Sequence, residues 1–139
     1  MDAQDIYDIT IIGAGPTGLF GAFYAGMRRL KTKVIEALPE PGGQLGVLYP
    51  EKIIYDVPGY PEIQADELVR QQMKQISRFP ITFCFEETVE QFEQTESGLV
   101  IQTDKATHHS RSLVITSGIG AFAPTKLRVK GAKRLRDMG

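Results

Sequence analysis

Three glycines near the start of the chain and one acidic residue farther along have the types and spacing that a dinucleotide site needs. Residues 13–18 read G-A-G-P-T-G, which fits the pattern G-x-G-x-x-G, and Glu36 follows Gly18 by 18 residues. We expect Gly13 to permit a tight turn, Gly15 to leave room for a pyrophosphate, and Gly18 to let a helix pack closely against a strand. Glu36 can accept hydrogen bonds from the ribose hydroxyls of an adenosine, and its negative charge disfavours a 2′-phosphate there.

The pattern is weak by itself, so the elements around it decide its value. Residues 7–15 form a short apolar, β-branched run that predicts a buried strand, and residues 16–29 carry apolar side chains at helical spacing, with Pro16 and Thr17 in the first turn. Residues 32–38 predict a second strand, parallel to the first. The helix N-terminus between these strands offers unpaired N–H groups to a phosphate. This context predicts a dinucleotide site and leaves both FAD and NAD open, with a glycine turn that only packs as the alternative.

The rest of the chain predicts further elements of an α/β fold. The pattern indicates a long ordered loop at 39–63, an amphipathic helix at 65–79 and a short strand at 81–85. A group of antiparallel strands at 87–109 and a last apolar strand at 112–118 follow. We therefore expect a Rossmann-like domain, with a central parallel sheet and a small antiparallel β-meander.

Composition narrows the class of protein. The chain has 139 residues, 42% of them hydrophobic and 24% charged, which is typical of one globular domain. The net charge of −1 gives no field that would attract nucleic acid or an acidic membrane. The uncharged stretch at residues 9–27 follows three aspartates and is interrupted by glycines, which disfavours a signal peptide or a membrane span. With the single cysteine, Cys84, this indicates a cytoplasmic protein without an intrachain disulfide.

Later motifs decide between the dinucleotides through a family resemblance. The segments G-G-Q-L at 42–45 and L-Y-P-E-K-I-I-Y-D-V-P-G-Y-P at 48–61, with those at 10–28 and 115–127, resemble the ferredoxin–NADP reductases of the thioredoxin-reductase-like type. In that family the first glycine fingerprint binds FAD, and the nicotinamide binds to a second, inserted domain. The resemblance therefore implies FAD as cofactor, NADPH in the intact enzyme, ferredoxin or a similar electron carrier as partner, and a homodimer when intact.

The resemblance also assigns roles to single residues. Thr17 would lie at the pyrophosphate, Glu36 at the ribose, Gln44 and Tyr49 near the flavin end, Val89 at the adenine through its backbone, and Phe122 near the isoalloxazine ring. From the residues alone, a solvated amide at Gln44 and ordinary packing at the other three flavin- and adenine-side positions are the alternatives. The full predicted cofactor set is Gly13, Gly15, Pro16, Thr17, Gly18, Glu36, Gly43, Gln44, Tyr49, Val89 and Phe122. No acid–base catalyst is assigned, because the cofactor carries the chemistry.

The chain departs from the family pattern in two places. It stops where the family enters its nicotinamide domain, so we expect an FAD domain at residues 1–125 that is incomplete at its C-terminal end, a linker at 126–139 toward an absent NADPH-binding domain, and no turnover with NADPH by the chain alone. No redox dithiol follows residues 42–43, which disfavours the glutathione-reductase type. The alternatives are a non-catalytic dinucleotide-binding module, or a fragment of a thioredoxin-reductase-like enzyme or an NAD-binding dehydrogenase.

Three further features carry weaker signals. Cys84 lies between two phenylalanines and predicts packing rather than a redox role. His108 and His109 are adjacent on a predicted strand, where they would point to opposite faces, and no cysteine or carboxylate cluster joins them in the sequence. We therefore expect surface histidines and no metal site. The basic tail at 126–136 predicts a solvated linker, with docking of an acidic electron carrier as the alternative.

Overall fold

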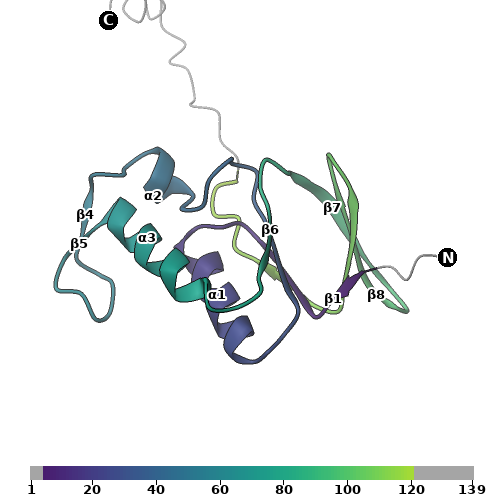
Figure 1. Ribbon diagram of the computed structural model, residues 1–139. Helices are drawn as coiled ribbons and strands as arrows, with labels where there is room; N and C mark the ends of the chain where they lie inside the picture. The colour runs from purple at the N-terminus through teal and green to yellow at the C-terminus, as the bar shows by residue number, and fades with distance from the viewer. Residues whose placement is uncertain (1–4, 121–139) are drawn as a thin grey trace, which may run out of the picture.

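Two sheets placed end to end organise the molecule, of which this computed structural model describes residues 5–120 (Figure 1). The first sheet is entirely parallel, and its strand order is β10-β2-β3-β6. Its elements in chain order are β2 (Ile9–Ile12), α1 (Pro16–Met27), β3 (Thr32–Ile35), α3 (Ala65–Ile76), β6 (Thr82–Cys84) and β10 (Leu113–Ile115). The repeated strand–helix–strand order gives the predicted Rossmann-like arrangement.

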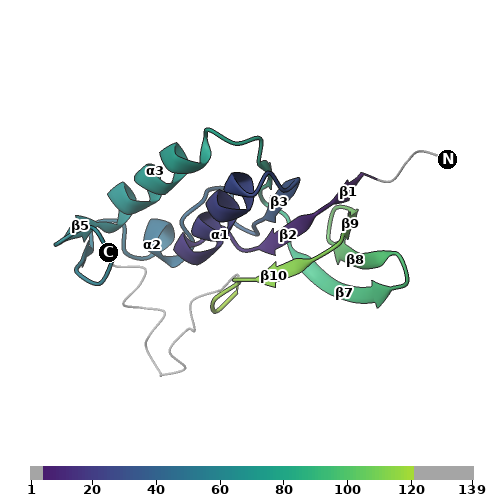
Figure 2. The same cartoon turned by 90° about the horizontal axis from the view of Figure 1, so that it is seen from below.

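The two central strands of the parallel sheet, β2 and β3, are largely buried. Helices α1 and α3 pack against each other and lie side by side (Figure 2). Ile11 of β2, Val34 of β3 and Leu19 of α1 are fully buried in the resulting core, which α3 completes with Val69 and Ile76. Strands buried in this way have continuous apolar or β-branched sequences, which is why their positions could be predicted.

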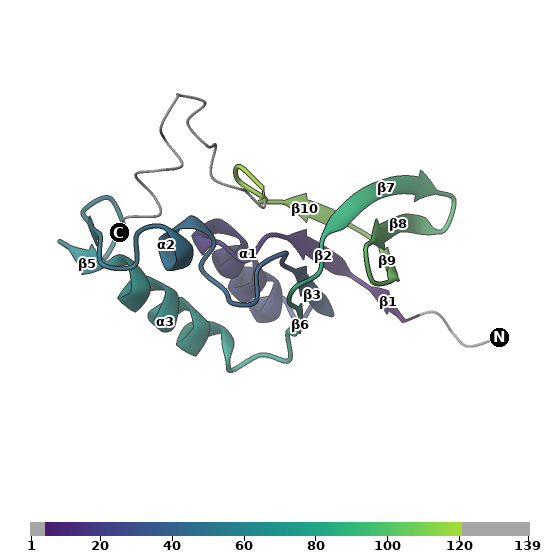
Figure 3. The same ribbon diagram turned by 90° about the horizontal axis from the view of Figure 1, so that it is seen from above.

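The second sheet is the predicted β-meander with one addition. Strands β7 (Val89–Thr95), β8 (Gly98–Thr103) and β9 (Thr107–Ser110) are antiparallel neighbours, and a short strand β1 (Ile6–Tyr7) pairs in parallel with β9. Two adjacent chain segments run from this sheet into the parallel one, β1 into β2 and β9 into β10 (Figure 3). The Ser112 hydroxyl donates to the Asp8 carbonyl at 2.7 Å and joins the two segments at the crossing.

The segment predicted as a long loop contains more regular structure than expected. It holds a one-turn helix, α2 (Gln44–Val47), and a small antiparallel pair, β4 (Ile53–Ile54) with β5 (Ile63–Gln64). These elements are too short to produce a sequence period. Both long helices also end two or three residues earlier than predicted. Within residues 5–120, no helix is long and apolar enough to cross a membrane.

Candidate functional site

A glycine turn connects the end of β2 to the start of α1. Gly13 has a positive φ of 99°, a conformation that favours glycine, and its N–H donates to the Ile35 carbonyl of β3 at 2.8 Å. The helix follows at once, because the Leu19 N–H donates to the Gly15 carbonyl at 2.9 Å. We call residues 13–18 the cradle. It stands at the carboxyl ends of two neighbouring parallel strands, where open α/β sheets bind their ligands.

The three cradle glycines are needed for different reasons. A Cβ atom on Gly13 would lie 2.5 Å from the Thr116 carbonyl oxygen, and one on Gly18 would overlap the Gly13 carbonyl oxygen and lie 2.7 Å from the Thr116 hydroxyl. Packing within the chain therefore explains Gly13 and Gly18. A Cβ atom on Gly15 would meet no atom of the described residues within 4 Å. There is therefore room at Gly15 that the packing of residues 5–120 does not use.

The N-terminus of α1 is open toward that room. Gly15 is the N-cap residue, no side chain caps the helix, and its first turn contains no acidic residue. The first N–H groups of a helix lack internal partners and carry partial positive charge, so they attract an anion. With Pro16 at the first helical position and Thr17 after it, this end of α1 suits a phosphate.

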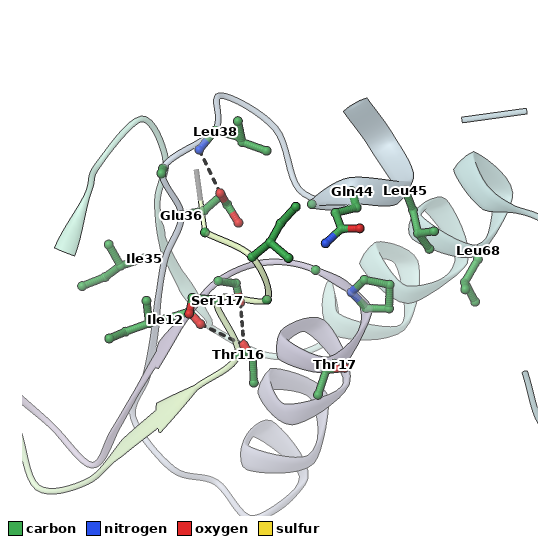
Figure 4. Close-up of a pocket in the computed structure, with 18 of the residues that line it drawn as sticks. Ile12, Thr17, Ile35, Glu36, Leu38, Gln44, Leu45, Leu68, Thr116 and Ser117 are labelled. Carbon is green, nitrogen blue, oxygen red and sulfur yellow. Dashed lines mark hydrogen bonds between the residues drawn. The ribbon is translucent and has the colours of Figure 1, made fainter. Parts of the chain in front are cut away.

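Thr116 supports the cradle through hydrogen bonds. The sequence did not single out this residue. Its hydroxyl donates to the carbonyl oxygens of Ile12 at 2.9 Å and Gly13 at 3.1 Å, as Figure 4 shows. Its own N–H also donates to the Ile12 carbonyl at 2.8 Å. Thr116 lay inside the last predicted strand, at 112–118, where a threonine is too common to serve as a signal; in the structure it directly follows β10.

Glu36 is a buried carboxylate fixed by two backbone groups. The residue follows β3 and is 7% exposed. Its Oε2 accepts the Ala14 N–H of the cradle at 2.7 Å, and its Oε1 accepts the Leu38 N–H at 2.8 Å. Each carboxylate oxygen keeps further acceptor capacity. The carboxylate is thus oriented beside the cradle with free lone pairs, which suits the ribose hydroxyls that the sequence predicted as its partners.

The glycine pair of the next motif rests on the cradle. The Gly42 N–H donates to the Ala14 carbonyl at 2.8 Å, and a Cβ atom on Gly43 would lie 3.3 Å from the Gly15 Cα. Both residues have positive φ, at 118° and 55°. Glycine at both positions therefore lets the loop approach the cradle and turn into α2, which begins with Gln44.

These parts surround a cavity of about 910 Å³. Its volume lies within the roughly 300–1,000 Å³ typical of cofactor sites. Figure 4 shows the Glu36 and Gln44 side chains entering it from the end of β3 and from α2. The predicted residues that line it are Gly13, Gly15, Pro16, Thr17, Glu36, Gly43, Gln44 and Val89.

The other predicted residues lie elsewhere. Gly18 is buried in α1, where it allows close packing rather than lining the cavity. Tyr49 is 54% exposed, lies below the Lys52 ammonium and does not line the cavity, so its contact with a cofactor stays a prediction. Phe122 lies outside the described residues, as does the basic tail. Sequence reasoning missed further walls of the cavity, among them residues 52–57, Thr88 and Ser117.

The expectation of two surface histidines was wrong for His108, which lies in a group with a cysteine and a carboxylate. The His108 side chain is only 10% exposed, and its Nε2 lies 2.6 Å from the Glu87 carboxylate. Cys84 completes a group whose potential ligand atoms lie within 4.8 Å of one another. The register of β9 brings His108 against β3 and β6, which spacing along the sequence could not reveal. Burial, followed by the neighbouring Glu87 charge, raises the pKa of the Cys84 thiol, in line with the predicted packing role.

The geometry of the cavity agrees with the chain's similarity to known proteins. No family model matches the chain. It is 53% identical over 132 residues to ferredoxin–NADP reductase 2 of Bacillus cytotoxicus and 51% identical to the ferredoxin–NADP reductase of Halalkalibacterium halodurans, covering 94% of this chain and 40% of each relative. The chain therefore spans about 40% of the length of the curated relatives that it matches.

Solved structures of thioredoxin reductases have a similar fold. The thioredoxin reductase of Lactococcus lactis superposes with a TM-score of 0.75 at 25% identity, covering 94% of this chain and 41% of that one. The enzyme of Streptococcus pyogenes gives 0.72 at 27% identity, covering 81% and 35%. These likenesses confirm the predicted fold class and the predicted resemblance to ferredoxin–NADP reductases of the thioredoxin-reductase-like type.

Proposed function

We propose that the cavity binds FAD and that the chain supplies the FAD-binding part of an oxidoreductase that moves electrons between NADPH and ferredoxin. The unfilled space at Gly15 carries the proposal, because it adjoins an uncapped helix N-terminus and nothing within residues 5–120 explains it. Glu36 fits the ribose, and Gln44 offers a donor and an acceptor to a polar ring edge. The residues present therefore fit a flavin dinucleotide.

The chain's own contribution is to bind and orient the cofactor. When bound, FAD supplies a ring that takes up a hydride and gives up single electrons. The α1 N-terminus neutralises pyrophosphate charge, and Glu36 fixes the adenosine end. The carboxylate also selects against a 2′-phosphate, so NADPH is not the ligand that we propose for this cavity. We assign no acid or base to this chain.

The relatives' names extend the proposal to the whole protein. They are ferredoxin–NADP reductases, so we infer ferredoxin as the electron partner. A homodimer when intact, a cytoplasmic location, and the division into a cofactor domain at 1–125 and a linker at 126–139 stay predictions. No partner surface for ferredoxin is assigned.

The visible spectrum of the purified chain tests the cofactor directly. We expect flavin absorbance bands, either as isolated or after incubation with FAD and removal of the excess by gel filtration. Calorimetric titrations with FAD, NAD and NADPH give the selectivity, and we expect FAD to bind most tightly. A colourless protein that binds NAD and not FAD would contradict the proposal and favour the dehydrogenase alternative.

A further inference from the structure

Three ionisable side chains lie buried together outside the cradle. Glu87 is 7% exposed, Lys33 is 8% exposed, and the His108 side chain is 10% exposed. Buried charges are rare unless they are paired and hydrogen-bonded. We call Lys33, Glu87, Thr103 and His108 the Glu87 cluster. The proposed binding of FAD uses none of these four side chains directly.

Hydrogen bonds run through the cluster without a break. Glu87 Oε1 accepts the Thr103 hydroxyl at 2.6 Å and lies 2.6 Å from His108 Nε2, while His108 Nδ1 lies 2.7 Å from Lys33 Nζ. An ammonium group can only donate, so Nδ1 accepts and the proton of the imidazole sits on Nε2, from which it is donated to Glu87. The imidazole thus links Lys33 to the Glu87 carboxylate through its two ring nitrogens.

The cluster joins three parts of the fold. Lys33 belongs to β3 of the parallel sheet, while Thr103 and His108 belong to β8 and β9 of the antiparallel sheet. Glu87 lies in the short connection between β6 and β7, which passes from one sheet to the other. Its carboxylate is therefore the point at which the connection is fastened to both sheets.

The backbone of the same connection forms a wall of the cavity. The Glu87 N–H donates to the Glu36 carbonyl at 3.0 Å, and the Thr88 N–H donates to the Asp104 carboxylate at 2.8 Å. Glu87, Thr88 and Val89 line the cavity, as does Glu36. Because Glu36 marks the ribose end, this wall faces the adenosine half of a bound dinucleotide.

We propose that Glu87 is a positioning residue for the adenosine half of the cofactor, an inference that rests on the proposed FAD site. Its carboxylate, held by His108 and Thr103, fixes where residues 87–89 stand against Glu36. The wall is then ordered before the cofactor arrives, so binding does not have to order it. Glu87 acts on the cofactor through the backbone of its own connection, which its carboxylate anchors.

A metal site is the competing use of the same residues. Cys84, Glu87 and His108 have suitable ligand atoms within 4.8 Å of one another. The imidazole nitrogen that would bind an ion already meets Glu87 at 2.6 Å, and an ammonium lies on the other nitrogen at 2.7 Å. A cation would have to break the first bond and lie near the positive charge of Lys33, so the contacts favour the hydrogen-bonded anchor.

Titrations with three ligands distinguish a positioning role of Glu87 from a general loss of structure. FAD contains both halves, ADP keeps the adenosine and pyrophosphate, and FMN keeps the flavin with one phosphate. We expect Glu87→Ala to weaken the binding of FAD and of ADP by roughly tenfold, the usual size of an indirect coupling. The affinity for FMN should change little. Glu87→Gln retains an acceptor for Thr103 and should fall between the wild type and the alanine variant. Glu93→Gln makes the same chemical change on the exposed face of β7 and should change nothing.

Each outcome of these titrations decides something. Equal losses for all three ligands, together with a lower unfolding midpoint in both Glu87 variants, would reduce Glu87 to a structural role and overturn the inference. If Glu87→Ala binds FAD as tightly as the wild type, the inference is overturned and the proposed function stands. If the wild type does not bind FAD, both the proposed function and the inference are overturned. FAD affinity that depends on added zinc and disappears in Cys84→Ser would also overturn it in favour of the metal site.

Discussion

The cradle and the Glu87 cluster lie on two sides of the same short connection, yet they are built in opposite ways. The cradle consists mainly of backbone groups from one contiguous run, residues 13–18, completed by Glu36. The cluster consists of side chains from strands distant in the sequence, with Lys33 and His108 separated by 75 residues. A site made of backbone requires glycine at fixed local positions, whereas a site made of side chains requires only that the register brings them together.

The largest expected effect separates the structural glycines from the one facing the cavity. Gly18→Ala forces a Cβ into the Gly13 carbonyl and should lower the free energy of unfolding by about 3 kcal/mol. The methyl group of Gly15→Ala meets no atom of the part of the chain that the structure describes, so stability should change by less than about 1 kcal/mol, the scale of an altered N-cap. Urea unfolding of both variants measures this difference.

The order of the two variants should reverse when FAD binding is measured, with the larger effect in Gly15→Ala. The Gly15 methyl group occupies the space proposed for the pyrophosphate, so we expect FAD affinity to fall by more than about tenfold, or 1.4 kcal/mol. A Gly15→Ala chain that binds FAD as tightly as the wild type would remove the basis for treating Gly15 as the ligand-facing glycine.

The next effect tests whether the buried carboxylate of the cradle is structural as well as ligand-binding. Glu36→Ala leaves the Ala14 and Leu38 N–H groups without their acceptor and should cost about 2 kcal/mol of stability before any ligand is added. Glu40→Ala removes an exposed carboxylate nearby and serves as the matched control. Equal unfolding midpoints for the two variants would show that the backbone bonds to Glu36 contribute nothing.

The smallest effect concerns the charge of Glu87. Burial raises the pKa of this carboxyl, but the hydrogen bonds from Thr103 and His108 outweigh burial and hold the pKa below its ordinary value of 4.5. A carboxyl whose pKa is lowered by folding stabilises the protein at pH values above the unfolded pKa, and the contribution disappears as pH falls through the folded pKa. We expect the stability difference between wild type and Glu87→Gln to be constant near neutral pH and to shrink below about pH 4.5.

Urea unfolding at several pH values between neutral and the acid range measures that difference. Glu93→Gln, in which the carboxylate is exposed, should show no such trend. A difference that grows as the pH falls would mean that protonated Glu87 is the stabilised form, and the hydrogen-bond directions assigned to the cluster would then be wrong.

The contrast between the two sites also explains what could be predicted from the sequence. The parallel strands and the cradle were predictable because buried parallel strands have continuous apolar runs and because G-x-G-x-x-G is a steric requirement over six adjacent residues. Glu36 was predictable because its distance from the motif is set by one helix and one strand. The family resemblance then added FAD, and similarity to known reductases supports that choice.

Other contacts depend on register and could not be predicted. Nothing in the spacing of Thr116 indicates that its hydroxyl meets the Gly13 carbonyl, and nothing near His108 indicates Glu87 or Lys33. The histidine pair was interpreted as exposed because alternation on a strand says which residues share a face and not what covers that face. The elements β1, α2, β4 and β5 were missed because each is shorter than one full period of its pattern.

The bond between Thr116 and the cradle has a consequence for the order in which the molecule can be assembled. The two ends of the contact are 104 residues apart in the chain for Ile12 and 103 for Gly13. Strand β10, which carries Thr116 to this position, pairs with β2 and is among the last described elements to leave the ribosome. Contacts of such long separation form late and slowly, because a large loop must close first. A nascent chain therefore exposes the glycine turn without this support until β10 has been made and Thr116 can reach the Ile12 and Gly13 carbonyls.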